Sequence, residues 1–201
     1  MSRAVLASIA RRLNREFGRR AGGPALPPLL FLTDPARTPD PVAVAARLPP
    51  GAGVIYRHFG AEDRFAVAFR LRKVTRARGG MLLIGGGDFE LARKVRADGV
   101  SVPERLMRTR PAWSGLVLAA AHSRAALARA KALGMGGALL SPVFPSRSPS
   151  AGRPLGALKA GLLARQAGMP VYALGGVNHR TAARLIGRGF AGLAAVDALK
   201  D

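Results

Sequence analysis

Short apolar runs alternate with longer amphipathic segments along this chain from residue 29 onward. The runs place Val, Ile, Leu and Ala on consecutive positions, which is typical of strands buried on both faces. No turn pair suited to a two-residue hairpin joins them, so the pattern favours parallel strands connected by crossover helices. The predicted strands are Leu29–Thr33, Gly53–Arg57, Met81–Ile84, Gly99–Val102, Gly115–Ala119, Ala138–Val143, Val171–Leu174 and Gly192–Val196.

The segments between the runs have the spacing of amphipathic helices, and Gly134, Gly168 and Gly189 stand before strands, where helix termini belong. Eight such units predict an α/β fold, a (β/α)8 TIM barrel that is compact beside the typical length of about 250 residues. The alternative is an open doubly wound sheet, but it lacks the expected Gly-x-Gly-x-x-Gly turn after its first strand. The predicted helices are Val42–Leu48, Glu62–Arg78, Asp88–Arg96, Pro103–Arg108, Arg124–Leu133, Leu155–Gln166 and His179–Gly187.

Residues 1–20 have the pattern of a basic amphipathic helix, with apolar side chains at helical spacing among arginines. Such a helix packs on its own domain, lies at a membrane interface or serves as an organellar targeting segment. We expect residues 1–23 to form this helix and a linker, and residues 24–201 to form a single barrel domain. The last barrel helix is short or absent, and the amino-terminal helix is placed to cover that gap.

The chain carries 32 basic and 11 acidic residues, a formal net charge of +21. Such a charge favours association with nucleic acid, anionic lipid or anionic metabolites. The excess is mostly arginine, and the few aromatic residues do not interleave with it as a base-stacking surface requires. This argues against specific nucleic-acid binding.

The sequence contains no cysteine, which excludes disulfides, zinc–thiolate sites and thiol nucleophiles and is typical of an intracellular protein. No apolar run approaches the roughly 20 residues needed to cross a bilayer, and the first residues lack the apolar core of a secretory signal. We expect a cytoplasmic protein, with the choice between monomer and homo-oligomer left open.

One loop stands out as a candidate anion site. The apolar run from Gly137 breaks at Ser141-Pro142 into a stretch rich in hydroxyl groups that reaches Arg153. Its backbone donors and cations suit a phosphate, although a polar surface loop without a ligand has the same composition. The phosphate-binding candidates here are Ser146, Arg147 and Ser148.

Other candidates follow from the barrel prediction, because active groups of this fold gather at the carboxyl ends of the strands. Gly175 and Gly176 end the seventh strand, where a bare backbone either approaches a phosphate or makes a tight turn. His122 follows the fifth strand and is an acid/base candidate at neutral pH, unless it is merely packed. Asp34 and Arg57 either anchor a ligand or pair with each other.

The strand ends resemble those of the thiamin phosphate synthase and TenI (thiazole tautomerase) superfamily, whose members are (β/α)8 barrels. The resemblance covers residues 29 to 199 in unbroken order, and the order and spacing of the segments make it more specific than any one motif. The matching segments are LLFLTDP at 29–35, VIYRHF at 54–59, LLIGGG at 82–87, ADGVSVPE at 97–104, AAAHS at 119–123, SPVFPSRSPS at 141–150, YALGGV at 172–177 and GFAGLAAVDAL at 189–199.

The resemblance implies roles for individual residues. The synthase joins a hydroxymethylpyrimidine diphosphate to a thiazole phosphate with magnesium and releases pyrophosphate. Arg57 matches a diphosphate-binding arginine, and Ser146 and Ser148 match hydroxyl residues that hold the diphosphate. Gly176 matches the glycine at the thiazole phosphate, and His122 matches the histidine used as acid/base by the tautomerase branch.

The sequence departs from the family pattern at the expected magnesium site. The Asn-Asp after the third strand reads Gly85-Gly86, and the second aspartate falls at or beside Arg105. Two lysines are replaced by Phe59 and Pro149, and a serine at the thiazole phosphate by Asp197. Magnesium is expected of a synthase, but these positions supply no side chain that we expect to bind it. Arg105, Arg147 and Arg153 are candidate replacements for its charge.

Three hypotheses about function remain open. The first is a thiamin-biosynthesis protein that binds thiazole or pyrimidine phosphates and resembles the synthase, with a metal-independent, tautomerase-like isomerase using His122 as the enzymatic alternative. The second is a non-catalytic barrel that binds a phosphorylated ligand, because fold does not fix function. The third is an anion- or nucleic-acid-associating protein driven by its charge.

Overall fold

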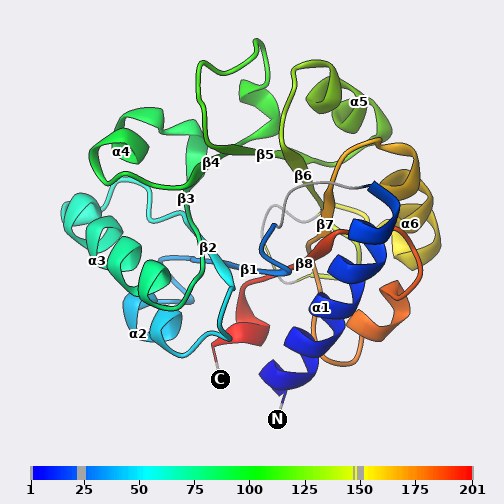
Figure 1. The fold of residues 1–201 in the computed structure, drawn as a ribbon, viewed down its shortest axis with the longest axis horizontal. Helices are drawn as coiled ribbons and strands as arrows, with labels where there is room; N and C mark the ends of the chain where they lie inside the picture. The colour runs from blue at the N-terminus through cyan, green and yellow to red at the C-terminus, as the bar shows by residue number, and fades with distance from the viewer. Residues whose placement is uncertain (1, 22–25, 147, 149–151, 201) are drawn as a thin grey trace.

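The computed structural model describes residues 2–21, 26–146, 148 and 152–200. Eight parallel strands pair in chain order, and β1 (Leu29–Leu32) pairs with β8 (Gly192–Ala195) to close the barrel (Figure 1). The predicted barrel is therefore confirmed over the open sheet. The other strands are β2 (Gly53–Tyr56), β3 (Leu82–Ile84), β4 (Gly99–Val102), β5 (Leu116–Ala121), β6 (Gly137–Leu140) and β7 (Val171–Ala173).

The largest difference at a strand end is in β6, which was predicted to continue to Val143 but ends at Leu140. Pro142 explains the early end, because proline has no N–H to donate to a neighbouring strand. The chain then leaves the barrel and forms the loop that precedes the next helix. This break brings the hydroxyl-rich loop to the carboxyl end of the barrel.

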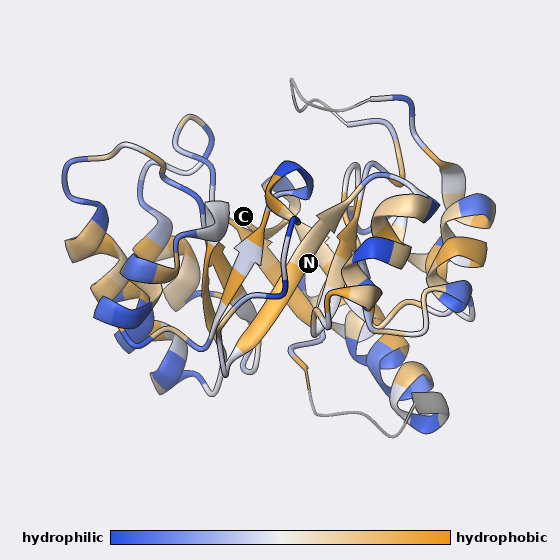
Figure 2. Cartoon of the chain, turned by 90° about the horizontal axis from the view of Figure 1, so that it is seen from above, coloured by the Kyte–Doolittle hydropathy of each residue, from blue (hydrophilic) through white to orange (hydrophobic). Residues whose placement is uncertain are grey.

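Helices surround the barrel, with their polar faces outward and the apolar strands inside (Figure 2). Two predicted helices, 103–108 and 179–187, are only short 3-10 turns, η2 (Glu104–Leu106) and η3 (Ala182–Leu185). A short helix is marginal by itself, so packing against the rest of the fold decides whether such a segment completes an α-helix. The other elements are α1 (Ser2–Ala21), α2 (Pro41–Ala46), α3 (Arg64–Ala77), α4 (Phe89–Lys94), α5 (Arg124–Ala132), α6 (Gly156–Gln166), η1 (Gly85–Gly87) and η4 (Asp197–Leu199).

Strand residues alternate between two apolar cores. Leu30, Ile55, Leu83 and Tyr172 point into the barrel and are fully buried. Their neighbours along the strands pack against the helices in the outer core. Because both faces are covered, strand positions read as continuous apolar runs in the sequence rather than as alternating ones.

Helix α1 covers the barrel beside β1 and β8, where the last turns are too short to do so (Figure 1). On the side of α1 that faces the barrel, Leu6, Ala10 and Leu13 are fully buried. Asn14 Nδ2 donates to the carbonyl of Ala191 at 2.9 Å, and Glu16 accepts from the N–H of Gly187 at 2.9 Å. Of the three expectations for this helix, packing on its own barrel describes the structure. The boundary proposed at residues 23 and 24 lies outside the described residues and stays a prediction.

Among the described helices, none is both long enough and apolar enough to span a lipid bilayer.

Candidate active site at the carboxyl ends of the strands

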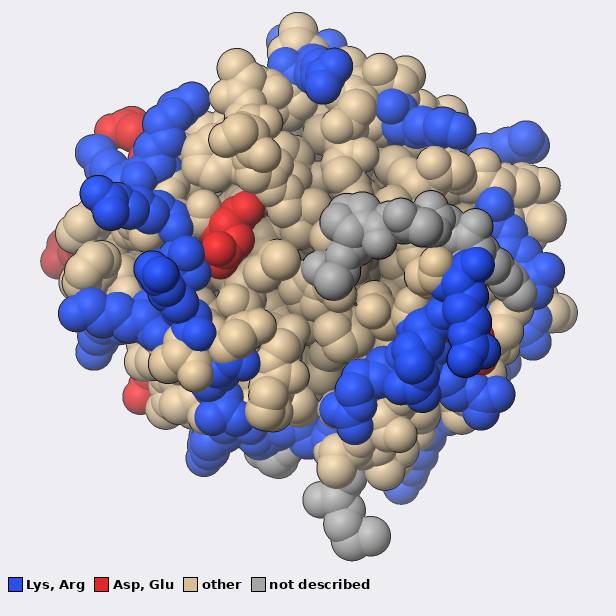
Figure 3. Space-filling model, in the orientation of Figure 1, with Lys and Arg blue, Asp and Glu red and all other residues tan. Residues whose placement is uncertain are grey.

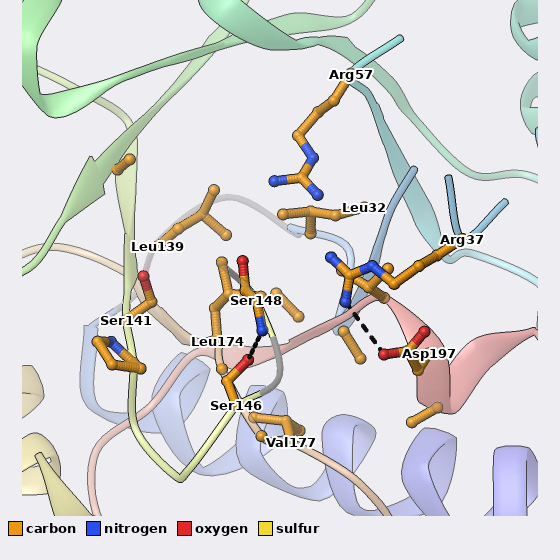
Figure 4. A pocket seen from close by; sticks show the side chains of 18 of the residues that line it. Leu32, Arg37, Arg57, Leu139, Ser141, Ser146, Ser148, Leu174, Val177 and Asp197 are labelled. Carbon is orange, nitrogen blue, oxygen red and sulfur yellow. Dashed lines mark hydrogen bonds and ion pairs between the residues drawn. The ribbon is translucent and has the colours of Figure 1, made fainter. Parts of the chain in front are cut away.

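A cleft of about 700 Å³ opens at the carboxyl ends of the strands. Its walls include six of the sequence-predicted site residues, which follow β2, β5, β6 and β7. Figure 4 shows Arg57, Ser146 and Ser148 among them. Asp34 stands beside the cleft, in contact with a lining arginine. Arg147 lies outside the described residues. The predicted residues that line the cleft are Arg57, His122, Ser146, Ser148, Gly175 and Gly176.

An ion-pair network forms one wall of this cleft. Arg37, in the loop after β1, lies between two carboxylates: its Nη2 is 2.8 Å from Asp34 Oδ2 and its Nη1 is 3.1 Å from Asp197 Oδ2. The hydrogen bond from Arg37 holds the pKa of Asp34 below its ordinary value. Burial acts to raise the pKa of Asp197, but Lys200 and Arg37 outweigh it and lower that pKa. Both carboxylates are therefore charged at neutral pH.

Thr33, which directly follows β1, holds Arg57 in position. The Nε of Arg57 donates to the carbonyl of Thr33 at 2.9 Å, and its backbone N–H donates to Thr33 Oγ1 at 2.8 Å. Its Nη2 is 3.8 Å from Asp34 Oδ2, so the predicted Asp34–Arg57 pair exists but is looser than the pair with Arg37. The guanidinium groups of Arg57 and Arg37 point toward the part of the cleft that holds Ser148 (Figure 4). Burial lowers the pKa of Arg57, but an arginine remains charged.

His122 is held at the rim by Glu104 and by Ser141, whose carbonyl oxygen and hydroxyl both lie near Nδ1. Its backbone N–H donates to Glu104 Oε2 at 3.0 Å. Its Nδ1 lies 2.7 Å from the carbonyl oxygen of Ser141, and because a carbonyl only accepts, Nδ1 carries the proton in this contact. In the neutral ring, Nε2 is then the nitrogen that can accept a proton. The ring is exposed and lines the cleft, so it is not a packed core histidine.

The Gly175–Gly176 turn packs directly on the hydroxyl-rich loop. Both glycines have positive φ, 88° and 62°. A Cβ on Gly176 would lie 2.3 Å from the carbonyl oxygen of Pro145. The N–H of Phe144 donates to the Gly175 carbonyl at 3.0 Å and holds the loop in this position. The close packing of the two segments therefore needs glycine here, as the tight-turn interpretation proposed, and the role toward phosphate stays a prediction.

Arg180 is a functional candidate that sequence reasoning missed. Asn178 Oδ1 accepts from the N–H groups of Arg180 and Thr181 at 2.8 and 3.1 Å, and Thr181 Oγ1 donates to the Gly176 carbonyl at 2.9 Å. This turn places Asn178, His179 and Arg180 in the cleft wall. The run Asn-His-Arg-Thr directly after the glycine pair was the available signal.

Four carboxylates near this rim are paired with cations. Besides Asp34 and Asp197, Asp88 pairs with Arg64 and accepts from the N–H of Leu91. Glu104 accepts from His122 and pairs with Arg129. The described residues contain no group of three or more His, Asp or Glu side chains that could hold a metal ion.

Of the positions at which the resemblance implies a departure, Phe59, Gly85, Gly86 and Asp197 line the cleft, and Pro149 lies outside the described residues. Gly85 and Gly86 line it without side chains, and the ring of Phe59 lies where a Cβ of Gly86 would point, 2.7 Å from Cε1. Arg105 and Arg153, expected as replacements for a metal, are exposed and are not among the lining residues. The cations in the described lining are Arg37, Arg57 and Arg180.

The model of a family described as thiamine monophosphate synthase matches residues 29–199. The thiamine-phosphate synthase of Lactococcus lactis subsp. cremoris is 27% identical over 158 residues, which cover 74% of this chain and 70% of that protein. A putative thiamine-phosphate synthase of Geobacter sulfurreducens is 31% identical over 139 residues, 66% of this chain and 65% of that protein.

Solved structures agree with this match at the level of the fold. The thiamine phosphate pyrophosphorylase of Pyrococcus furiosus superimposes with a TM-score of 0.75 at 24% identity, over 86% of this chain and 87% of that one. The corresponding protein of Bacteroides thetaiotaomicron gives a TM-score of 0.58 at 18% identity, over 84% and 83%. The family match spans every strand of the barrel and the whole cleft, and the chain therefore belongs to the thiamine monophosphate synthase family.

Proposed function

We propose that the cleft binds a phosphorylated thiazole or pyrimidine precursor of thiamine, and that His122 catalyses a proton-transfer isomerisation of it without magnesium. The observation that carries this proposal is the division of charges in the cleft. Arg37, Arg57 and Arg180 line it together with His122. The carboxylates of Asp34, Asp88, Glu104 and Asp197 are paired with cations. The site is thus suited to hold an anion and to move a proton.

The residues at this rim do not fit the magnesium ion of the synthase. Magnesium is held by carboxylate oxygens together with substrate phosphates. The carboxylates of Asp34, Asp88, Glu104 and Asp197 each already accept from a guanidinium or ammonium group. No step of the proposed reaction is therefore assigned to a metal.

The isomerisation needs an anchor, a base and an acid. The phosphate of the substrate binds the guanidinium groups, which make charge-assisted hydrogen bonds to its oxygens. The Nε2 atom of His122 accepts a proton from one atom of the thiazole. It then returns the proton to another atom of the same molecule. The contact from Nδ1 to the Ser141 carbonyl keeps the ring oriented, so that Nε2 is the nitrogen that exchanges the proton.

The test measures the rate at which the tautomer of the thiazole phosphate carboxylate is converted in the presence of EDTA. Chromatography separates the substrate from the product. His122→Ala is expected to lower the conversion rate by about 100-fold or more, which is the usual contribution of general acid–base catalysis. Binding of the tautomer, measured by calorimetry, should remain within about threefold because the arginines are intact. Unchanged conversion in His122→Ala would refute the assigned role.

A synthase is the second candidate, because the family match covers residues 29–199. It predicts that hydroxymethylpyrimidine diphosphate and thiazole phosphate give thiamine phosphate when magnesium is added and not in EDTA. That result would contradict the proposed metal-independent chemistry. Binding of either precursor without any turnover would instead identify a ligand-binding barrel.

A further inference from the structure

A second groove, of about 550 Å³, lies between the first turns of α1 and the connection from α2 to β2. That connection and the end of α3 both lead into the amino ends of strands, so the groove is at the opposite end of the barrel from the cleft. Figure 3 shows Lys and Arg side chains along this edge of the molecule, between α1 and α2. The groove is lined by Arg3, Ala4, Ala7, Arg11, Arg47, Leu48, Pro49 and Arg78.

Two of the four arginines are held in place by backbone carbonyls. Arg3 Nη1 donates to the carbonyl of Arg47 at 2.7 Å. Arg78 donates to the carbonyl of Leu48 from Nε at 3.0 Å and from Nη2 at 2.5 Å. A guanidinium has five N–H donors, so the two bonds to Leu48 fix Arg78 and still leave it donors for another acceptor. The bond from Arg3 therefore joins α1 to the α2–β2 connection at the groove.

The other two arginines extend into solvent at the groove. Arg11 and Arg47 are exposed, and among the described residues their guanidinium groups have no hydrogen-bond or ion-pair partner. Within the described part of the chain, the groove lining contains no acidic side chain. The cationic side chains of Arg11, Arg47 and Arg78 share this groove and repel one another, and the amino-terminal end of α1 adds the positive end of a helix dipole. A bound anion would remove this repulsion.

The chemistry of the groove identifies the class of anion. Guanidinium groups bind phosphate oxygens in pairs of parallel hydrogen bonds, which ammonium groups do not. The remaining walls are the small apolar side chains of Ala4, Ala7, Leu48 and Pro49, and no aromatic ring is present to stack on a base. We propose that this groove binds a small phosphate-bearing anion, at a site separate from the cleft.

The test uses inorganic pyrophosphate as the probe, titrated calorimetrically into the full chain in EDTA at about 50 mM and about 200 mM salt. We expect two binding events, one at the cleft and one at the groove. The double variant Arg11→Gln with Arg47→Gln should lose the groove event, weakened by about tenfold or more, because two charge-assisted partners are removed. The cleft variant Arg57→Gln should keep it.

A matched control removes the same charge elsewhere. Arg108 and Lys159 are exposed, line neither the groove nor the cleft, and make no side-chain hydrogen bond or ion pair among the described residues. Arg108→Gln with Lys159→Gln should leave both events within about twofold, because distant surface charges are screened by salt. Circular dichroism checks that all variants are folded.

Three results would overturn the proposal. The first is a groove event that survives in Arg11→Gln with Arg47→Gln. The second is an equal loss in the control pair, which would show a general effect of net charge. The third is binding of mixed-sequence duplex DNA that depends on Arg11 and Arg47 when pyrophosphate binding does not, which would make the groove part of a nucleic-acid surface.

Discussion

Replacing Gly176 with alanine tests whether close packing of two loops builds the cleft. Gly176 has a φ of 62°, and a Cβ there would lie 2.3 Å from the carbonyl oxygen of Pro145 and 2.8 Å from Phe144 Cβ. The positive φ costs roughly 1–2 kcal/mol for a residue with a side chain. The overlap with neighbouring atoms adds about 1–3 kcal/mol, as in other overpacked sites. The sum predicts a loss of about 2–5 kcal/mol in the free energy of unfolding.

Gly187 provides the matched control for this measurement. Its φ is 72°, but a Cβ there meets nothing within 4 Å. Gly187→Ala should therefore cost only the backbone term, roughly 1–2 kcal/mol. The assay is equilibrium unfolding in urea, followed by circular dichroism, with the slope compared between variants to confirm that the same surface is exposed. Because Gly176 also holds the loop of Ser146, its variant should bind pyrophosphate more weakly at the cleft.

Equal destabilisation of the two variants would refute this reasoning. It would mean that the segment Phe144–Pro145 moves away from the added methyl group at no cost, so that packing against β7 does not position the loop. Gly176→Ala with a normal free energy of unfolding would further show that the positive φ is not retained in the variant.

Two further predictions concern α1 and the ion-pair wall of the cleft. Leu13 is fully buried between α1 and the barrel, so Leu13→Ala should lower the free energy of unfolding by about 2–5 kcal/mol in urea titrations; a loss below about 1 kcal/mol would contradict an integral helix. The Arg37 hydrogen bond lowers the pKa of Asp34 in the folded state below its ordinary 3.8. The stabilisation from this pair is therefore complete above that ordinary value and is lost as the pH falls through the folded pKa. Asp34→Asn should reduce the loss of unfolding free energy at acid pH by about 1 kcal/mol or less, because the pair is partly exposed. An unchanged acid dependence would show that Arg37 does not stabilise the fold through Asp34.

Local sequence patterns were enough to predict the strands but not every helix. The strands are buried on both faces, so each appears as an uninterrupted apolar run. The segments 103–108 and 179–187 have helical spacing, yet they form only the 3-10 turns η2 and η3. Spacing reports which face is apolar, whereas the length of a helix depends on how many hydrogen bonds the connection can complete.

The candidate site was predictable where a residue directly ends a strand. Arg57 and His122 follow β2 and β5, and both line the cleft. Arg37 and Arg180 were missed because they lie farther along their loops, and only the folded loops return them to the cleft. Arg105 and Arg153 were proposed as replacements for the charge of a metal ion. Both are exposed and neither lines the cleft, so their positions do not support that role.

The sequence by itself determined a parallel sheet covered by helices, because eight apolar runs separated by helical segments can bury both faces of their strands only in that arrangement. The closure of this sheet into the predicted barrel is shown by the pairing of β1 with β8. The sequence also determined which end of the strands carries polar groups. Only the tertiary structure decided which charges pair. Arg37 lies between Asp34 and Asp197, which are 163 positions apart in the chain, and α1 meets the α2–β2 connection to form the arginine groove. These contacts depend on barrel closure between β1 and β8, and no local pattern records which side chains that closure brings within hydrogen-bonding distance.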